Sequence, residues 1–170
     1  YMEKIIRMFI LAGQSNMAGR ADASGIPISY RNFYNKVLFS NYCGFLLDRT
    51  PPYFSTGLTQ LGPCKKHHST PNKHFGPELS FAERITKLYP EDEIVIIKVA
   101  VGGSSLSLDW KPDAIQGLCL YSVLLKRLKQ AGKELYEKGL STKVEGVFWM
   151  QGEGDTLTSQ VANQYEENLK

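Results

Sequence analysis

The sequence predicts an α/β domain built on a mainly parallel sheet. Three short and nearly continuous apolar segments, at 5–11, 94–101 and 144–150, are typical of strands that are covered on both faces. Amphipathic patterns with helical spacing precede and follow the later two segments. This alternation of strand and helix is the signature of a sheet whose faces are covered by helices.

Each apolar segment ends at a small or polar residue. The first holds Ile, Met, Phe and Leu, is interrupted by Arg7, and ends at Gly13. The second, IVIIKVAV, is β-branched almost throughout and ends at Gly102. The third, VEGVFWM, ends at Gln151. Because β-branched and aromatic residues favour strands and glycine ends them, we expect three buried strands over these ranges.

The first helix is expected to begin at Pro77, a favoured residue for the first turn. Glu78 follows where the helix dipole stabilises a negative charge. The helix should stop at Tyr89-Pro90. Its apolar residues fall three apart and are Leu79, Ala82, Ile85 and Leu88.

A longer helix is expected over 120–138, with Gly139 as its C-terminal stop. Its apolar stripe consists of Leu124, Leu125, Leu128 and Leu135. Its exposed side is expected to hold Lys126, Arg127, Lys129 and Lys133. A third helical pattern runs over 161–170, where Val161, Tyr165 and Leu169 form one stripe with no stop signal behind them.

The segment 20–75 breaks this rhythm. It holds five of the 8 prolines and all 3 histidines, and only 37–39 within it reads as a short strand. The length of 170 residues suits one domain rather than two. We therefore predict a single domain over 1–170 that carries a long irregular insertion over 20–75.

Composition excludes several classes of protein. With 20 basic and 17 acidic residues, the net charge of +3 does not demand a nucleic-acid partner. No apolar run approaches the ~20 residues that a membrane span needs. We therefore expect a globular domain with neither a nucleic-acid nor a membrane partner, whereas compartment and oligomeric state stay open.

Three polar segments follow the three predicted strands, at the sheet edge where ligands of α/β proteins bind. Ser15 stands directly after the first strand. It could be a nucleophile whose hydroxyl stands clear of the backbone, or the cap of a helix. The segment is not a G-x-S-x-G elbow, because Met17 replaces its last glycine. The three segments are GQSNM at 13–17, GGSS at 102–105 and QGEGD at 151–155.

The other two segments also allow two interpretations each. Gly102-Gly103 could bring backbone N–H groups close to a ligand or could simply form a tight turn. Gln151 could offer an amide N–H to an oxyanion or satisfy loop backbone. Glu153 and Asp155 could be an acid/base pair or a metal site, although charges at a helix start are the commonest use of acids there.

Zinc is not predicted. The spacing of the candidate ligands, Cys64, His67, His68 and His74, matches no standard zinc pattern. They are expected to be loop residues.

Four motifs together resemble the sialate O-acetylesterase family, also described as the carbohydrate esterase family 6 type, within the SGNH-hydrolase superfamily. They occur in the family's order, and the GQSNM and QGE motifs are the specific ones. The matching segments are FILAGQSNMAGR at 9–20, HFGPELSFA at 74–82, VAVGGSSLSLDW at 99–110 and FWMQGEGDT at 148–156.

The resemblance implies a flavodoxin-like three-layer α/β/α fold and hydrolysis of acetyl esters on sugars, without metal or organic cofactor. Ser15 falls on the family's nucleophile. Gly103, with Gly102 as the alternative, falls on its glycine oxyanion donor, and Gln151 on a further donor. The positions near the family's substrate pocket are Gln14, Asn16, Glu78 and Glu153.

One family motif is absent. The family's catalytic His and its Asp partner lie in a DxxH motif near the C-terminus, and no histidine follows His74 here. We therefore expect a fold that lacks the family's last strand and helix, and a chain that is inactive by itself. Two alternatives stay open: a non-catalytic carbohydrate-binding module, and a short esterase that uses His74 as its base.

Overall fold

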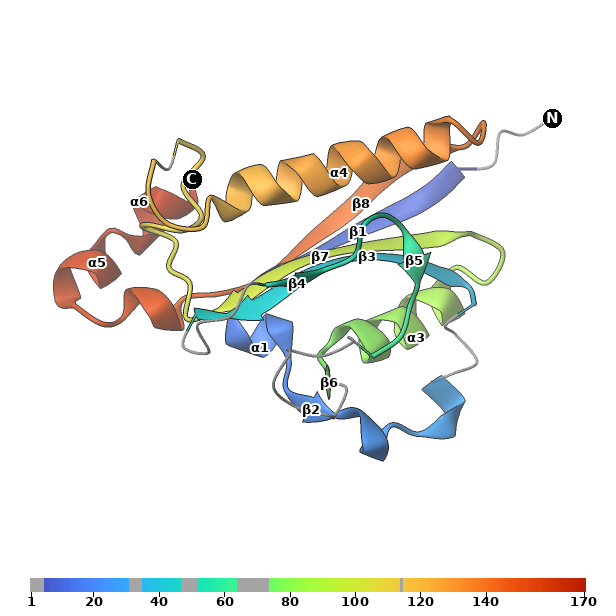
Figure 1. Ribbon diagram of the computed structural model, residues 1–170, viewed down its shortest axis with the longest axis horizontal. Coiled ribbons are helices and arrows are strands. Elements are labelled where there is room, and N and C mark those ends of the chain that lie inside the picture. Colours follow the sequence, from blue (N-terminus) through green and yellow to red (C-terminus); the bar gives the residue numbers. More distant parts are fainter. Residues whose placement is uncertain (1–4, 31–34, 47–51, 64–73, 114) are drawn as a thin grey trace.

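The computed structural model describes residues 5–30, 35–46, 52–63, 74–113 and 115–170 (Figure 1). A six-stranded sheet runs through its centre in the order β4-β3-β7-β1-β8, and β5 also pairs with β3. The four long strands are parallel to one another. They are β1 (Ile5–Gly13), β3 (Val37–Phe45), β7 (Ile94–Gly102) and β8 (Ser141–Met150), and the short antiparallel additions are β4 (Tyr53–Phe54) and β5 (Thr59–Gln60).

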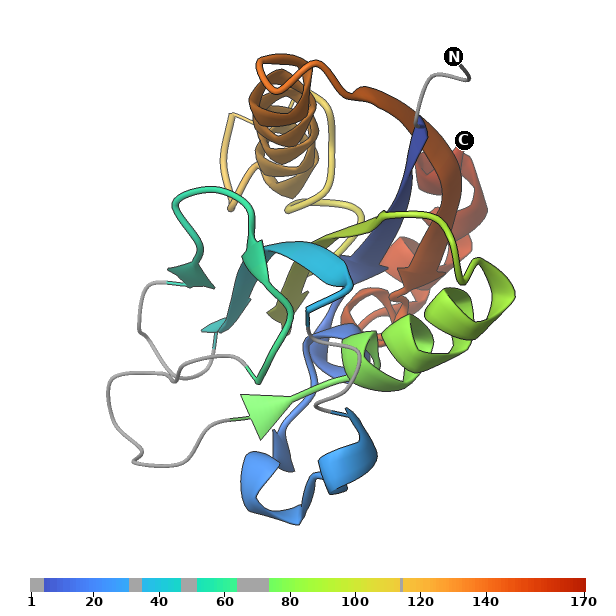
Figure 2. The same cartoon turned by 90° about the vertical axis from the view of Figure 1, so that its right-hand side faces the viewer.

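Helices cover both faces of this sheet (Figures 1 and 2). The long helix α4 (Leu120–Tyr136) lies on one face, and α1 (Ser15–Ala18) and α3 (Glu78–Leu88) lie on the other. The predicted α/β/α fold with a mainly parallel sheet is therefore confirmed. A separate two-stranded ribbon of β2 (Ala21–Asp22) and β6 (His74–Phe75) lies beyond α1.

Alternation along β1 and β7 divides the core between the two faces. Phe9 and Leu11 of β1 pack on the side of α1 and α3, whereas Ile10 and Ala12 pack on the side of α4. Successive side chains of a strand point to opposite faces, so a strand that is apolar throughout can fill both layers. Every residue of β7 is buried, as expected for the strand between β3 and β1.

The segment 20–75 is not irregular throughout, which corrects the sequence-based expectation. Nine of its residues form β3, a full strand of the central sheet, where only 37–39 was expected. Because polar residues stand in the middle of this strand, its sequence does not read as a continuous apolar segment. Ser40 and Asn41 are buried, and the Asn41 N–H donates to Ser55 Oγ at 3.1 Å. Buried polar groups that have partners fit inside a strand.

The third predicted strand exists, but it is not covered on both faces as we expected. Among the strands that the structure describes, β8 pairs only with β1 and stands at the edge of the sheet. Several of its apolar side chains are exposed, with Val147 at 61%. The apolar composition of 144–150 therefore leaves side chains exposed on both faces of this edge strand: Val147 pairs with Ile10 on the side of α4, and Phe148 pairs with Leu11 on the side of α3.

The two helices predicted at 77–89 and 120–138 are confirmed as α3 and α4. On α4, however, Arg127 is buried, and Leu125 is partly exposed. The buried stripe runs through Leu120, Arg127, Ala131 and Leu135, so a cation occupies a position of the core face. Among the described residues no helix is long and apolar enough to cross a membrane.

The helix predicted over 161–170 is broken into two short ones, α5 (Ser159–Asn163) and α6 (Tyr165–Leu169). Gln164 separates them. Tyr165 turns back onto the end of β8, where its hydroxyl donates to Gln151 O at 2.8 Å and accepts from Trp149 Nε1 at 3.0 Å. These two hydrogen bonds fix Tyr165 at the end of β8, and the side chain contributes to the core cluster under α4.

Candidate active site

The ends of β7, β1 and β8 lie side by side, and this alignment brings the three polar segments together. Gly13, the last residue of β1, pairs with Ala100 on β7 and with Met150 on β8. The loops that follow these strands therefore leave the sheet at the same edge, which is next to α1 in Figure 1. The structure thus places the predicted site residues Ser15, Gly103 and Gln151 around one edge of the sheet.

Ser15 is the first residue of α1 and is half-buried. The N-cap residue of this helix is Gln14, and its side chain makes no capping hydrogen bond, so Ser15 does not serve as a cap. Within the described residues, neither the hydroxyl nor the N–H of Ser15 has a hydrogen-bond partner. The backbone before it is held by a bond from Gln14 N–H to Met150 O at 2.9 Å.

The structure separates the roles of the two glycines after β7. A Cβ on Gly102 would lie 2.2 Å from the Phe45 ring, so Gly102 is needed for packing. Gly103 is exposed and has a φ of +84°, which suits glycine alone. Its N–H has no acceptor within the described residues. Gly103 is therefore the better candidate for an oxyanion donor.

Gln14 is a buried brace between loops. Its Oε1 accepts from Gly154 N–H at 3.0 Å, from Gln151 Nε2 at 3.3 Å and from Gly152 N–H at 3.4 Å. These three donors all belong to the loop after β8. The side chain that sequence analysis assigned to the substrate pocket thus holds the first loop against the third.

In this structure, the side-chain amide of Gln151 donates its hydrogen bonds to neighbouring loops. Its Nε2 donates to Asp155 Oδ2 at 2.6 Å and to Ser104 O at 3.2 Å, while its Oε1 is buried and has no partner within the described residues. An amide nitrogen has two hydrogens to donate. Gln151 can therefore donate to an oxyanion only after one of these bonds is exchanged.

Asp155 is buried and connects the loop after β8 to the loop after β7. Its carboxylate accepts from Leu106 N–H at 2.7 Å and from Ser107 N–H at 3.0 Å, in addition to Gln151. Asp155 does lie in the first turn of a short 3-10 helix, Glu153–Asp155, as the sequence favoured, but its carboxylate accepts from the loop after β7. One sequence signal could have indicated this role of Asp155. The run of small residues at 103–105 predicts a loop, and the backbone N–H groups that follow it need an acceptor.

Asn16 and Glu153 lie at the rim of the same edge. The Asn16 amide donates to Glu153 Oε1 at 2.6 Å, and both side chains are exposed. This bond joins the residue after Ser15 to the loop after β8. The two predicted pocket residues are thus brought together beside Ser15, where a bound molecule could reach them.

Glu78, which the family resemblance placed near the substrate pocket, makes a buried ion pair. It is fully buried, and its Oε2 lies 2.5 Å from the ammonium of Lys98, which is also fully buried. Lys98 donates in addition to Ala18 O at 2.8 Å, and Gly76 N–H donates to Glu78 Oε1 at 2.9 Å. This cluster ties α3 and β7 to the last residue of α1, the helix that begins with Ser15.

His74 lies on the β2–β6 ribbon, where it pairs with Asp22. Its Nδ1 is buried, and no partner for it is found within the described residues. The pKa of the Asp22 carboxyl lies below its usual value because Ser24 N–H donates to it, and His74 adds to the effect. No hydrogen bond between His74 and Ser15 exists in the part of the chain that the structure describes.

Metal ligands do not gather in the described part of the chain, where no group of three or more suitable side chains occurs. The other three residues considered for zinc, Cys64, His67 and His68, lie outside the described residues.

Comparison with known proteins points to one family. A family model described as carbohydrate esterase, sialic acid-specific acetylesterase, matches residues 6–170. A probable carbohydrate esterase of Arabidopsis thaliana is 25% identical over an alignment of 178 residues that includes gaps. The alignment covers 96% of this chain and 60% of that protein.

Two crystal structures share the fold. That of the Arabidopsis thaliana protein has a TM-score of 0.63 at 22% sequence identity and covers 96% of this chain and 64% of its own. That of NanS has a TM-score of 0.62 at 20% identity and covers 99% of this chain and 63% of its own. The chain thus spans about three fifths of the length of the relatives that it matches.

Proposed function

Because the chain belongs to the sialic acid-specific acetylesterase family of carbohydrate esterases, we propose that it hydrolyses acetyl esters on sugars with Ser15 as its nucleophile. The observation that carries this proposal is the environment of Ser15. Its hydroxyl and N–H lack partners within the described residues, and the equally unpartnered N–H of Gly103 follows the neighbouring strand. A serine nucleophile needs an accessible hydroxyl and nearby donors for the developing oxyanion.

In the proposed reaction, Ser15 Oγ attacks the carbonyl carbon of the acetyl group and gives up its proton to a general base. The N–H groups of Ser15 and Gly103 stabilise the negative charge on the tetrahedral oxygen. The sugar oxygen then leaves with a proton, and water hydrolyses the acetyl-enzyme. Sialic acid, xylan and similar glycans are the candidate carriers of the acetyl group.

Gln151 is the third oxyanion donor of the proposal. Its bond to Ser104 O, at 3.2 Å, is the longer of its two strong contacts, and this is the hydrogen that would turn toward the substrate. Catalytic hydrogen bonds often take their final geometry only once a substrate is bound. Asn16 and Glu153 at the rim are proposed to contact the sugar.

The general base is proposed to come from a DxxH motif outside these 170 residues. His74 pairs with Asp22 on a separate ribbon, which does not favour it as the base for Ser15. By this reasoning, His74→Ala should leave the esterase activity of a chain extended by the DxxH segment unchanged. A short esterase that uses His74 would instead lose its turnover in that variant.

Covalent labelling by a fluorophosphonate tests the nucleophile. We expect one adduct, located on Ser15 by mass spectrometry, which is lost in Ser15→Ala. The matched control is Ser105→Ala, which removes another half-buried serine at the same edge of the sheet. The proposal fails if neither this chain nor one extended by the DxxH segment is labelled at Ser15. Saccharide binding that is unaffected by Ser15→Ala would then favour the non-catalytic binding module.

A further inference from the structure

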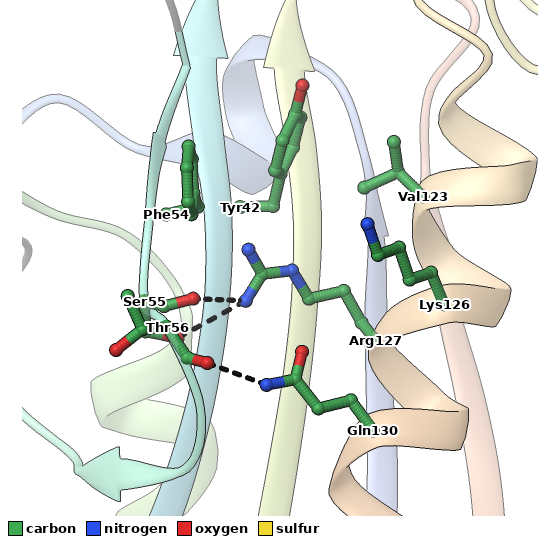
Figure 3. Close-up of a pocket in the computed structure, with 8 residues that line it drawn as sticks. All are labelled: Tyr42, Phe54, Ser55, Thr56, Val123, Lys126, Arg127 and Gln130. Atoms are coloured by element: carbon green, nitrogen blue, oxygen red, sulfur yellow. Dashed lines mark hydrogen bonds between the residues drawn. The ribbon is translucent and has the colours of Figure 1, made fainter.

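A second pocket lies between α4 and the β3–β4 edge of the sheet, with a volume of about 310 Å³. It opens on the face that α4 covers, whereas Ser15 begins α1 on the opposite face (Figures 1 and 3). None of the residues assigned above to the candidate active site lines it. The lining consists of Tyr42, Phe54, Ser55, Thr56, Val123, Lys126, Arg127 and Gln130.

Two aromatic rings form one wall of this pocket. Tyr42 and Phe54 lie on the paired strands β3 and β4, with ring centroids 6.2 Å apart and an interplanar angle of 21°. Phe54 is 53% exposed, so much of its ring faces solvent rather than the core. Aromatic side chains beside a few polar groups are typical of the lining of small-molecule sites.

Arg127 forms the floor of the pocket and is only 8% exposed. Its Nη1 donates to Ser55 O at 2.6 Å and to Ser40 Oγ at 3.3 Å. Its guanidinium carbon lies 5.4 Å from the centroid of the Phe54 ring and 5.8 Å from that of Tyr42. In Figure 3, the other terminal nitrogen points away from Ser55, toward the wall formed by Tyr42 and Phe54, and Lys126 extends from the next position of α4.

The two cations of the pocket lack an acidic partner. Within the described residues, neither Lys126 nor Arg127 forms an ion pair. Glu134, further along α4, accepts instead from Leu58 N–H at 3.0 Å and from Gln130 Nε2 at 3.1 Å. Burial lowers the pKa of Arg127 and raises that of Tyr42, in keeping with a site that is poorly solvated.

A buried cation that has hydrogen bonds but no acidic partner remains costly, and a bound anion would offset that cost. The guanidinium is a planar fork that matches the geometry of a carboxylate. The volume is at the small end of the ~300–1,000 Å³ range of ligand pockets, so it suits a single ring.

We propose that this pocket is a second, non-catalytic site that binds a monosaccharide carrying a carboxylate. The carboxylate lies between the free end of Arg127 and the ammonium of Lys126. The apolar face of the sugar ring packs against Phe54 and Tyr42. This site is independent of the proposed esterase chemistry, because it shares no residue with Ser15 and its neighbours.

Binding is tested by following backbone amide NMR shifts of the 170-residue chain during titration with glucuronate, glucose or inorganic phosphate. Glucose lacks the carboxylate, and phosphate lacks the ring. We expect glucuronate to shift resonances of α4, β3 and β4, and to bind at least about tenfold more tightly than either comparison compound. Ser15→Ala should leave this affinity unchanged, which separates the pocket from the active site.

Variants then locate the contacts. Arg127 holds Ser55 in place, so Lys126→Glu and Phe54→Ala, at exposed side chains, are the safer changes. We expect each to weaken glucuronate binding about tenfold or more. Lys129→Glu makes the same charge change at an exposed position of α4 outside the pocket and should have little effect.

Three results would each overturn the proposal: no glucuronate-dependent shifts at tens of millimolar, equal affinity for glucose, or equal losses in Lys126→Glu and Lys129→Glu. Phosphate binding as tightly as glucuronate would show a general anion site and would also overturn it. These outcomes are distinct from a failure of Ser15 labelling, which concerns the active site alone.

Discussion

Substitution of Lys98 by methionine should destabilise the protein severely. Lys98 and Glu78 are both 0% exposed, and their side chains meet at 2.5 Å. Methionine retains much of the lysine stem but removes the ammonium. The Glu78 carboxylate would then be left buried with Gly76 N–H as its donor, and Ala18 O would lose its side-chain donor.

Breaking a buried ion pair by removing one partner costs about 3–5 kcal/mol. The total stability of a domain of this kind is about 5–15 kcal/mol, so Lys98→Met should remove a large part of it. Glu78→Gln/Lys98→Met removes both charges together. Its cost should be smaller than the sum of the single changes by about 2 kcal/mol, within the range of coupling energies for residues in contact.

The free energy of unfolding can be measured by urea denaturation, followed by the fluorescence of Trp110 and Trp149. Lys87→Met is the matched control, because Lys87 forms an exposed ion pair with Glu83 at 2.8 Å. Exposed pairs contribute about 0–1 kcal/mol. The reasoning is refuted if Lys98→Met costs no more than Lys87→Met, or if the costs of the Lys98 and Glu78 changes simply add.

Three further predictions follow from packing, titration and exposure. Gly102→Ala should cost about 1–3 kcal/mol in urea denaturation, because its Cβ would lie 2.2 Å from the Phe45 ring, whereas Gly132→Ala, which has open space, should be neutral or stabilising. Burial raises the pKa of Tyr42 above 10.0, so the folded state retains this proton longer than the unfolded state. The contribution of the protonated Tyr42 phenol to stability is therefore complete below pH ~10 and is lost as the pH rises through the folded pKa. Ultraviolet titration of the protein, compared with that of Tyr42→Phe, should show one phenol that titrates late. A Tyr42 phenol that titrates at or below the ordinary value would contradict this prediction. Val147→Lys should reduce concentration-dependent association in sedimentation velocity, because Val147 is 61% exposed on the edge strand β8. Equal association of both proteins would count against this prediction.

The spacing of apolar residues along the sequence predicted those strands and helices in which buried side chains repeat at a regular interval. The strand at 94–101 and the helices at 77–89 and 120–138 were recognisable because their apolar residues repeat at the spacing that the fold requires. The position of the candidate site followed from the same reasoning, since strands of a parallel sheet end at one edge. Ser15 and Gly103 could therefore be expected near one another.

Other features depend on contacts between residues far apart in the sequence. Arg127 reads as a surface cation, yet its partners Ser40 and Ser55 lie on segments whose approach to α4 no local pattern indicates. Lys98 interrupts an apolar strand, and its contacts with Glu78, 20 positions away, and with Ala18 O explain it. Polar residues within 37–45 similarly concealed β3, because the partner that satisfies Ser40 is Arg127 on the distant helix α4.

Acetate release from an acetylated sugar tests the central claim most directly. The chain extended by a segment with the DxxH motif should be compared with its Ser15→Ala variant. The proposed mechanism predicts that the variant loses activity on the order of 10⁶-fold, as removal of the nucleophile does in serine hydrolases. Equal rates for the two proteins would show that Ser15 is not the nucleophile and would contradict the proposed function.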